Sequence, residues 1–229
     1  MEATHRYASP KSFRQALTDK LKQLTQASKW DLPQLQRQIA YDRLLARLYV
    51  SDDGWILKGA TALNARGIGV RGTLDIDLHR PVDTATAARE LRSAAALEPG
   101  DWFEFELGTA QRVSDAAAGL RIPVKALIGG TTWSAFHVDL VGAEVRMTGI
   151  PDETPPLARV SILDGAQRGY SVYPLVDHIA DKVAATFDRY GAARAPSTRY
   201  KDLVDLVALA KGVSVEATVQ MKALDSEAD

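Results

Sequence analysis

Asp75 and Asp77 lie two residues apart, and this spacing is the feature of the sequence that most directly suggests a site for catalysis or metal binding. They alternate with Leu74, Ile76 and Leu78, a pattern typical of a strand with one buried face, so both carboxylates should point to the same side. Two neighbouring carboxylates repel each other, and a divalent cation such as Mg²⁺ relieves the repulsion. A metal site is therefore one interpretation of the pair, and a solvated strand face is the other.

A short segment upstream could bind phosphate. Lys58, Gly59 and Thr61 lie where an apolar strand at 55–57 should turn into a helix. The first backbone N–H groups of a helix have no partner within it and can bind anions. Thr61 would add a hydroxyl donor, although an ordinary helix cap explains the same residues.

A third carboxylate, Asp139, lies in a later stretch that also alternates between polar and apolar residues, with His137 on the same face. If this strand is a neighbour of the one that carries Asp75 and Asp77, three carboxylates converge. Such a cluster is typical of phosphoryl-transfer sites that use two metal ions. The sequence leaves the adjacency of the strands open.

The elements that must position these residues follow from periodicity and punctuation. Apolar spacing predicts helices over 13–24, 31–48, 60–65, 84–97, 175–190, 197–211 and 215–224. Alternation predicts strands over 55–57, 73–78, 102–107, 120–128 and 135–141. Prolines between 149 and 157 indicate a connection between lobes. We expect an α/β (α+β) fold of two lobes, a mixed-sheet lobe at 1–156 and a mainly helical lobe at 157–229, with a ligand cleft between them.

Four motifs in one order resemble those of a known family. They are Lys58-Gly59-Ala60-Thr61-Ala62-Leu63, Arg71-Gly72-Thr73-Leu74-Asp75-Ile76-Asp77-Leu78, Asp181-Lys182 and Arg199-Tyr200-Lys201-Asp202-Leu203-Val204-Asp205-Leu206. The chain looks like the AbiEii/MenT group of nucleotidyltransferase toxins, in the DNA polymerase beta-like nucleotidyltransferase superfamily. The resemblance spans nearly the whole chain, and Ala60 stands where the family has a second glycine.

The resemblance implies a toxin of a toxin-antitoxin or phage-defence system. It would transfer a nucleoside monophosphate from an NTP to the 3′ end of tRNA with Mg²⁺ and so block aminoacylation, and an antitoxin protein would be its partner. Asp75 and Asp77 would hold metal, and Thr61 would contact the triphosphate. Lys182 and either Asp202 or Asp205 would complete the site from the helical lobe, because lysine suits phosphate as a point charge.

Two other functions stay open. One is a nucleotide- or protein-binding module that keeps the fold without turnover, and the other is a transferase that modifies a protein hydroxyl. A group of arginines could grip an RNA backbone or only keep the surface soluble. These are Arg66, Arg71, Arg80, Arg189, Arg194 and Arg199.

The composition excludes several classes of protein. The net charge of -1 gives no global attraction to nucleic acid, and the absence of cysteine excludes disulfides, thiolate catalysis and cysteine-ligated metals. The N-terminal residues lack the continuous apolar run of a signal peptide, and no stretch is apolar and long enough to span a bilayer. We expect a cytoplasmic protein that does not bind membranes.

Overall fold

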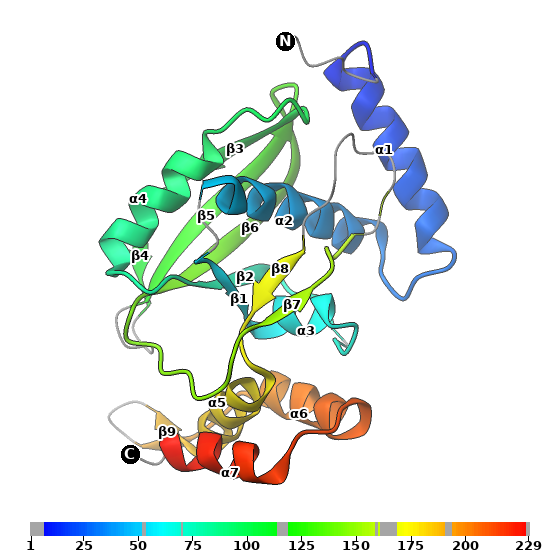
Figure 1. Cartoon of the computed structure of the whole chain (residues 1–229). Coiled ribbons are helices and arrows are strands. Elements are labelled where there is room, and N and C mark those ends of the chain that lie inside the picture. The colour runs from blue at the N-terminus through cyan, green and yellow to red at the C-terminus, as the bar shows by residue number, and fades with distance from the viewer. Residues whose placement is uncertain are drawn as a thin grey trace.

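The chain forms a mixed sheet flanked by helices, with a separate group of helices below it (Figure 1). The computed structural model describes residues 7–51, 54–69, 71–113, 119–158, 160, 169–190 and 194–227. The helices described there are α1 (Pro10–Thr25), α2 (Leu32–Ser51), α3 (Gly59–Ala65), α4 (Thr84–Ala95), α5 (Leu175–Phe187), α6 (Tyr200–Gly212) and α7 (Ala217–Ser226). The mixed α/β architecture confirms the expected fold class.

The main sheet combines parallel and antiparallel pairs. Its strands are β1 (Ile56–Lys58), β2 (Asp75–His79), β3 (Phe103–Leu107), β4 (Gln111–Arg112), β5 (Leu120–Ile128), β6 (Thr131–Val141), β7 (Asp152–Thr154) and β8 (Tyr170–Val172). Their order is β3-β5-β6-β2-β1-β8-β7, with β4 paired to β5. The β2–β6 and β1–β8 pairs are parallel, and the others are antiparallel. A second, two-stranded sheet pairs β9 (Arg189–Tyr190) with β10 (Ala195–Pro196).

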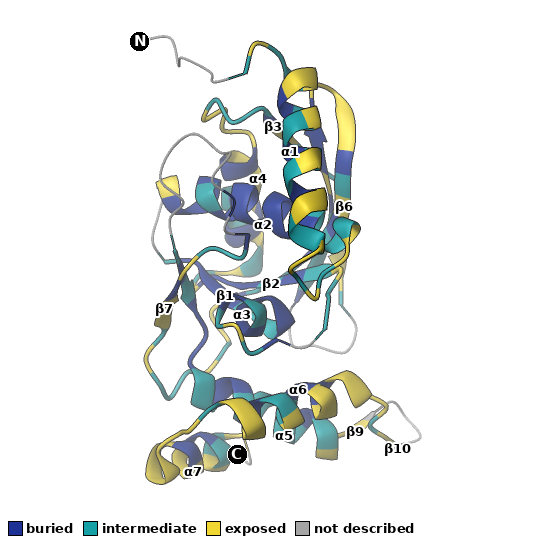
Figure 2. Cartoon of the chain, turned by 90° about the vertical axis from the view of Figure 1, so that its right-hand side faces the viewer, coloured by how far each residue is buried: buried dark blue, intermediate teal, exposed yellow. Residues whose placement is uncertain are grey.

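One face of the sheet is covered by α1, α2 and α4. The helices α1, α2 and α4 contact one another and the strands β3, β5 and β6. Apolar side chains of β2 and β6 that point to this layer, such as Ile76, Leu78, Val138 and Leu140, are fully buried. Figure 2 shows buried residues through the interior and exposed residues along the outer side of α1. Burial of alternate residues fixes the pleat, so the polar residues between them face away from these helices.

Helix caps fix where the covering helices begin. The Ser9 hydroxyl oxygen accepts a hydrogen bond from the Ser12 amide, and the Ser12 hydroxyl oxygen accepts one from the Ser9 amide, which is a capping box at the start of α1. Asp31 caps the Gln34 amide in α2, and Asp83 caps the Thr86 amide in α4. The sequence predicted these three helices to within a few residues.

The C-terminal helices form a small group of their own, in which α5 contacts both α6 and α7. Five short strands, β4, β7, β8, β9 and β10, were missed. The helix expected over 175–190 ends at Phe187, so β9 takes its last two residues, and β7 lies within the segment expected to be only a connection. Strand β8 lies beyond residue 156 and joins the main sheet through its parallel pair with β1. The division of the chain into lobes at 156 stays a prediction.

Candidate active site

Three carboxylates lie on the sheet face that α1, α2 and α4 do not cover. In the parallel β2–β6 register, Asp77 is opposite Asp139 and Asp75 is opposite His137. Strand pairs of this kind place facing side chains about 5 Å apart. The convergence that the sequence left open is therefore observed. On the other side of β2, Lys58 of β1 is the register partner of Asp77.

Asp77 carries negative charge that the protein only partly compensates. Burial raises the pKa of its carboxyl to about 6, and repulsion by Asp139 and Asp75 adds to the rise, against the attraction of Lys182 and Lys58. A carboxylate destabilised by its neighbours' charges is what a divalent cation with oxygen ligands would relieve. Asp75 and Asp77 therefore fit a metal ion as a pair of ligands.

Asp139, expected as a third ligand, is instead held by an arginine. The Arg121 side chain donates from Nε and Nη2 to the two carboxylate oxygens of Asp139, at 2.7 and 2.6 Å. Its Nη2 also lies 3.8 Å from Asp75 Oδ1. Within the described part of the chain, no group of three or more acidic or histidine side chains is arranged to hold a metal ion. The metal role of Asp139 stays a prediction.

The turn between β1 and α3 approaches the carboxylates closely. Gly59 has a φ of +62°, and a Cβ built on it would lie 1.8 Å from Oδ2 of Asp77. Only glycine allows both this left-handed conformation and the close approach. Ala60 follows Gly59. Its side chain is buried, and it lines a cavity that Asp77 also lines, which is described below.

The other two expected phosphate-binding residues of this turn have protein partners. Thr61 is buried, and its hydroxyl donates to the backbone oxygen of Asp75 at 3.1 Å, so it supports the strand instead of facing the cavity. Lys58 Nζ lies 3.2 Å from Asp181 Oδ2 and 3.7 Å from the centre of the Tyr173 ring. Lys58 also lines a smaller cavity of about 230 Å³ that reaches Asp77 and Lys182.

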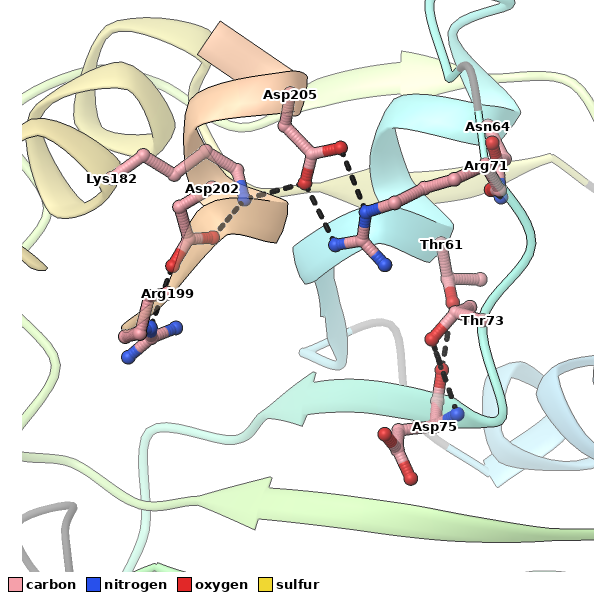
Figure 3. Close-up of polar contacts among 9 residues, drawn as sticks. All are labelled: Thr61, Asn64, Arg71, Thr73, Asp75, Lys182, Arg199, Asp202 and Asp205. Atoms are coloured by element: carbon pink, nitrogen blue, oxygen red, sulfur yellow. Dashed lines mark hydrogen bonds and ion pairs between the residues drawn. The ribbon is translucent and has the colours of Figure 1, made fainter. Parts of the chain in front are cut away.

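The helical side supplies a buried ionic cluster around Lys182 (Figure 3). Lys182 Nζ donates to Asp202 Oδ1 at 2.7 Å and to Asp205 Oδ2 at 2.9 Å. Arg71 binds both oxygens of Asp205, at 3.0 and 2.8 Å, and Arg199 binds Asp202 Oδ2 at 2.6 Å. Both aspartates therefore contact Lys182, and the choice between Asp202 and Asp205 as the functional residue stays open.

The cluster is more positive than negative and ties the two sides of the site together. Three cationic side chains surround two carboxylates, and Arg71 reaches the cluster from the segment between α3 and β2. Burial acts to raise the pKa of Asp202, but the hydrogen bond and charge of Lys182, with Arg199, outweigh it and hold that pKa below its ordinary value. Asp202 thus stays ionised, as a buried ion pair requires.

A single cavity of about 830 Å³ joins the sheet side to the helical side. Its volume is within the range of small-molecule sites and suits a nucleoside triphosphate. Charged residues from both sides line it. They are Arg37, Arg71, Asp75, Asp77, Arg121, Asp139, Lys182, Arg199, Lys201 and Asp202. The exposed ring of Tyr200 lies at the same cavity.

Four of the six arginines that could either grip an RNA backbone or keep the surface soluble have different roles in the structure. Arg71 and Arg199 line the cavity, as just described. Arg66 is bound to Asp152 and to the backbone oxygen of Tyr173, and Arg80 is buried with Glu90 as a partner. Arg66 and Arg80 therefore serve the fold. Arg121, the closest cation to the carboxylates of the sheet, was missed.

Comparison with known proteins identifies the family. A family model described as the nucleotidyl transferase AbiEii toxin of a type IV toxin-antitoxin system matches residues 43–228. The chain belongs to the AbiEii nucleotidyltransferase toxin family. A search of curated proteins found no significant match. The family membership confirms the resemblance inferred from the four motifs, and it accounts for a nucleotide-sized cavity lined with carboxylates and cations.

Solved structures agree with the AbiEii assignment at the level of the fold. MenT4, a nucleotidyltransferase toxin from Mycobacterium tuberculosis, has a TM-score of 0.60 at 16% identity, over 92% of this chain and 68% of that chain. The JHP933 protein from Helicobacter pylori has a TM-score of 0.50 at 15% identity, over 77% of this chain and 67% of that chain. None of the helices described here is long and apolar enough to cross a membrane.

Proposed function

We propose that this AbiEii-family chain binds an NTP and Mg²⁺ in the cavity between the sheet and α6, and transfers the nucleoside monophosphate to the 3′ end of tRNA. The observation that carries the proposal is the cavity itself, which brings Asp75 and Asp77 on one side together with Lys182 and Arg199 on the other. A pair of carboxylates for a cation, opposite cations for phosphates, is the arrangement that phosphoryl transfer needs.

In the proposed reaction, an acceptor hydroxyl attacks the α-phosphorus of the NTP in line with the leaving group. The new P–O bond forms as the bond to the β-phosphate breaks, pyrophosphate leaves, and the hydroxyl proton passes to a carboxylate of the sheet face. Mg²⁺ held by Asp75 and Asp77 would supply charge neutralisation at the phosphates. Positioning and electrostatic stabilisation then provide most of the rate.

The remaining roles follow from contacts. Arg199, whose side chain is 56% exposed, and Lys201 are accessible cations for the triphosphate at the cavity. Lys182 lines the cavity as a buried positive charge, and Asp202 and Asp205 hold its ammonium in place. Thr61 positions the backbone of Asp75 through its hydrogen bond. Gly59 lets the backbone lie against Asp77.

The acceptor and the cellular setting rest on the family. Membership of a type IV toxin-antitoxin family implies an antitoxin partner. We infer that the toxin acts in the cytoplasm on the acceptor end of tRNA, blocks aminoacylation and so arrests growth. The arginine and lysine side chains at the cavity are the groups that would bind the RNA backbone.

The test is a transfer assay with each of the four α-labelled NTPs, Mg²⁺ and total tRNA. Wild-type protein should label RNA, and sequencing the 3′ ends should show added nucleotides, whereas Asp75→Asn should label nothing. Label on protein in place of RNA would select the protein-modifying alternative. NTP binding without transfer to any acceptor would favour the binding module and contradict the proposal.

A further inference from the structure

Arg121 occupies an unusual place on the carboxylate face of the sheet. In the antiparallel β5–β6 register it is directly opposite Asp139, and Asp139 is opposite Asp77 on β2. The guanidinium therefore lies at the end of a row that crosses three strands. It lines the same cavity as Asp75 and Asp77, and its side chain is 42% exposed.

Arg121 makes a bidentate hydrogen-bonded ion pair with Asp139 and also lies close to Asp75. Nε and Nη2 bind the two oxygens of Asp139, which is the geometry in which a guanidinium pairs most strongly with a carboxylate. The same Nη2 is 3.8 Å from Asp75, so one positive charge serves two of the three acids. A guanidinium keeps its positive charge over the whole physiological pH range.

The three acids are thus neutralised unequally. Asp139 and Asp75 both lie within ion-pair distance of Arg121, whereas Asp77 makes no salt bridge within the described residues. Asp139, which Arg121 binds through both oxygens, is on the β5 side. Asp77 is on the β1 side, where its register partner Lys58 forms no ion pair with it. A cation that enters the cavity can therefore bind beside Asp77, whereas the position beside Asp139 is already occupied by the guanidinium of Arg121.

We propose that Arg121 is a built-in counter-cation that takes the place of a second divalent ion, so that the site binds one ion, at Asp75 and Asp77, while the guanidinium holds Asp139. The inference rests on the proposed function, because it assumes the metal site there. Arg121 is then a positioning residue that sets the number of ions. Removing its charge should open Asp139 to a second ion.

The test is Mn²⁺ binding to the full chain without nucleotide, followed by electron paramagnetic resonance of the free ion. Wild-type protein should bind one Mn²⁺ per chain, and Arg121→Gln should bind two. Arg121→Lys keeps the charge and should return the count to one. Lys125→Gln is the matched control, since Lys125 is an exposed cation four residues further along the same strand and loses the same charge.

A double variant, Arg121→Gln with Asp139→Asn, tests whether the second ion binds at Asp139. This double variant should again bind one Mn²⁺ per chain. A second ion in Lys125→Gln as well would show a general charge effect and overturn the inference. One ion in every protein, or two in the wild type, would also overturn it while leaving the metal site of the proposed function standing. No ion in any protein would reject both. Circular dichroism melting of each variant shows that it is folded.

Discussion

The two sides of the cavity use charge in opposite ways. On the sheet side three carboxylates face one arginine, and the acids are partly exposed. On the helical side two carboxylates are surrounded by three cations, and Lys182, Asp202 and Asp205 are all buried. The sheet side has more negative than positive charge. The helical side has more positive than negative charge, and each of its carboxylates has an ion-pair partner within the protein. Under the proposed function, the sheet side would receive the cation, whereas the helical side holds its cations in place through ion pairs within the protein.

This asymmetry has a structural cause. Carboxylates on neighbouring strands are forced together by the register, because Asp77 and Asp139 are partners whatever their charge. The cluster around Lys182 assembles from α5, α6 and the segment before β2, and its ion pairs join parts of the chain that are far apart in sequence. Disrupting the sheet side should therefore cost activity, and disrupting the helical side should cost stability.

The largest effect is expected for Asp77→Asn. Loss of the carboxylate should lower kcat/KM for nucleotide transfer by about 1,000-fold, or about 4 kcal/mol, since the cation that neutralises the phosphates would lose one of its two carboxylate ligands. The fold should persist, because the substitution removes a repelled charge. Steady-state transfer kinetics measure the change, with Asp19→Asn on the exposed side of α1 as control. Near-normal activity of Asp77→Asn would contradict the assignment of the sheet side.

A smaller effect, on stability, is expected for Lys182→Met. The substitution leaves Asp202 and Asp205 buried with less compensation, and breaking a buried pair from one side costs about 3–5 kcal/mol. The free energy of unfolding, measured in urea, should fall by about this amount. Lys211→Met, an exposed residue of α6, should change it little.

The same cluster offers an internal check by a double substitution. Adding Asp202→Asn to Lys182→Met should recover part of the loss, because the uncompensated charge is removed. If Lys182→Met unfolds no more easily than Lys211→Met, the cluster does not stabilise the helical side and the comparison fails.

Sequence reasoning recovered what local patterns encode. Strand alternation placed Asp75 and Asp77 on one face, and helical spacing placed Lys182 and Asp202 on α5 and α6. It could not recover what depends on pairing between distant strands. Arg121 was missed because its meaning comes only from the β5–β6 register, where it is the partner of Asp139. The alternation along β5 would have placed Arg121 on a polar face, but no local signal names its partner.

Two other differences have similar causes. The short strands β7 and β8 have three residues each, too few for an alternation to be visible, and they exist through their pairing with neighbours. Thr61 has the residue type for binding phosphate, yet the fold of α3 against β2 turns its hydroxyl to the backbone of Asp75. Residue type alone does not give the direction of a side chain.

The smallest effect concerns the pH dependence of stability without metal. The pKa of Asp77 is raised to about 6 in the folded protein from an ordinary value of 3.8, so the folded state binds the proton more tightly than the unfolded chain. The stability contributed by this group is present below pH 4 and is lost as the pH rises through about 6. In EDTA, which keeps metal ions away, Asp77→Asn has no carboxyl group to ionise at this position and so does not lose this stability as the pH rises. Its Tm should equal that of the wild type near pH 4 and exceed it by about 6 °C at pH 7.

The comparison between the two sides makes the sign of this difference informative. Asp202, whose pKa is held below its ordinary value, contributes stability that is present at neutral pH and lost in acid. The substitution Asp202→Asn should therefore lower the Tm at pH 7, and Asp77→Asn should raise it. Thermal melts of both variants at pH 4, 5, 6 and 7 measure the two trends. Parallel trends would mean that the two sides are neutralised alike, and the sheet side would then have no unmet charge for a cation to satisfy.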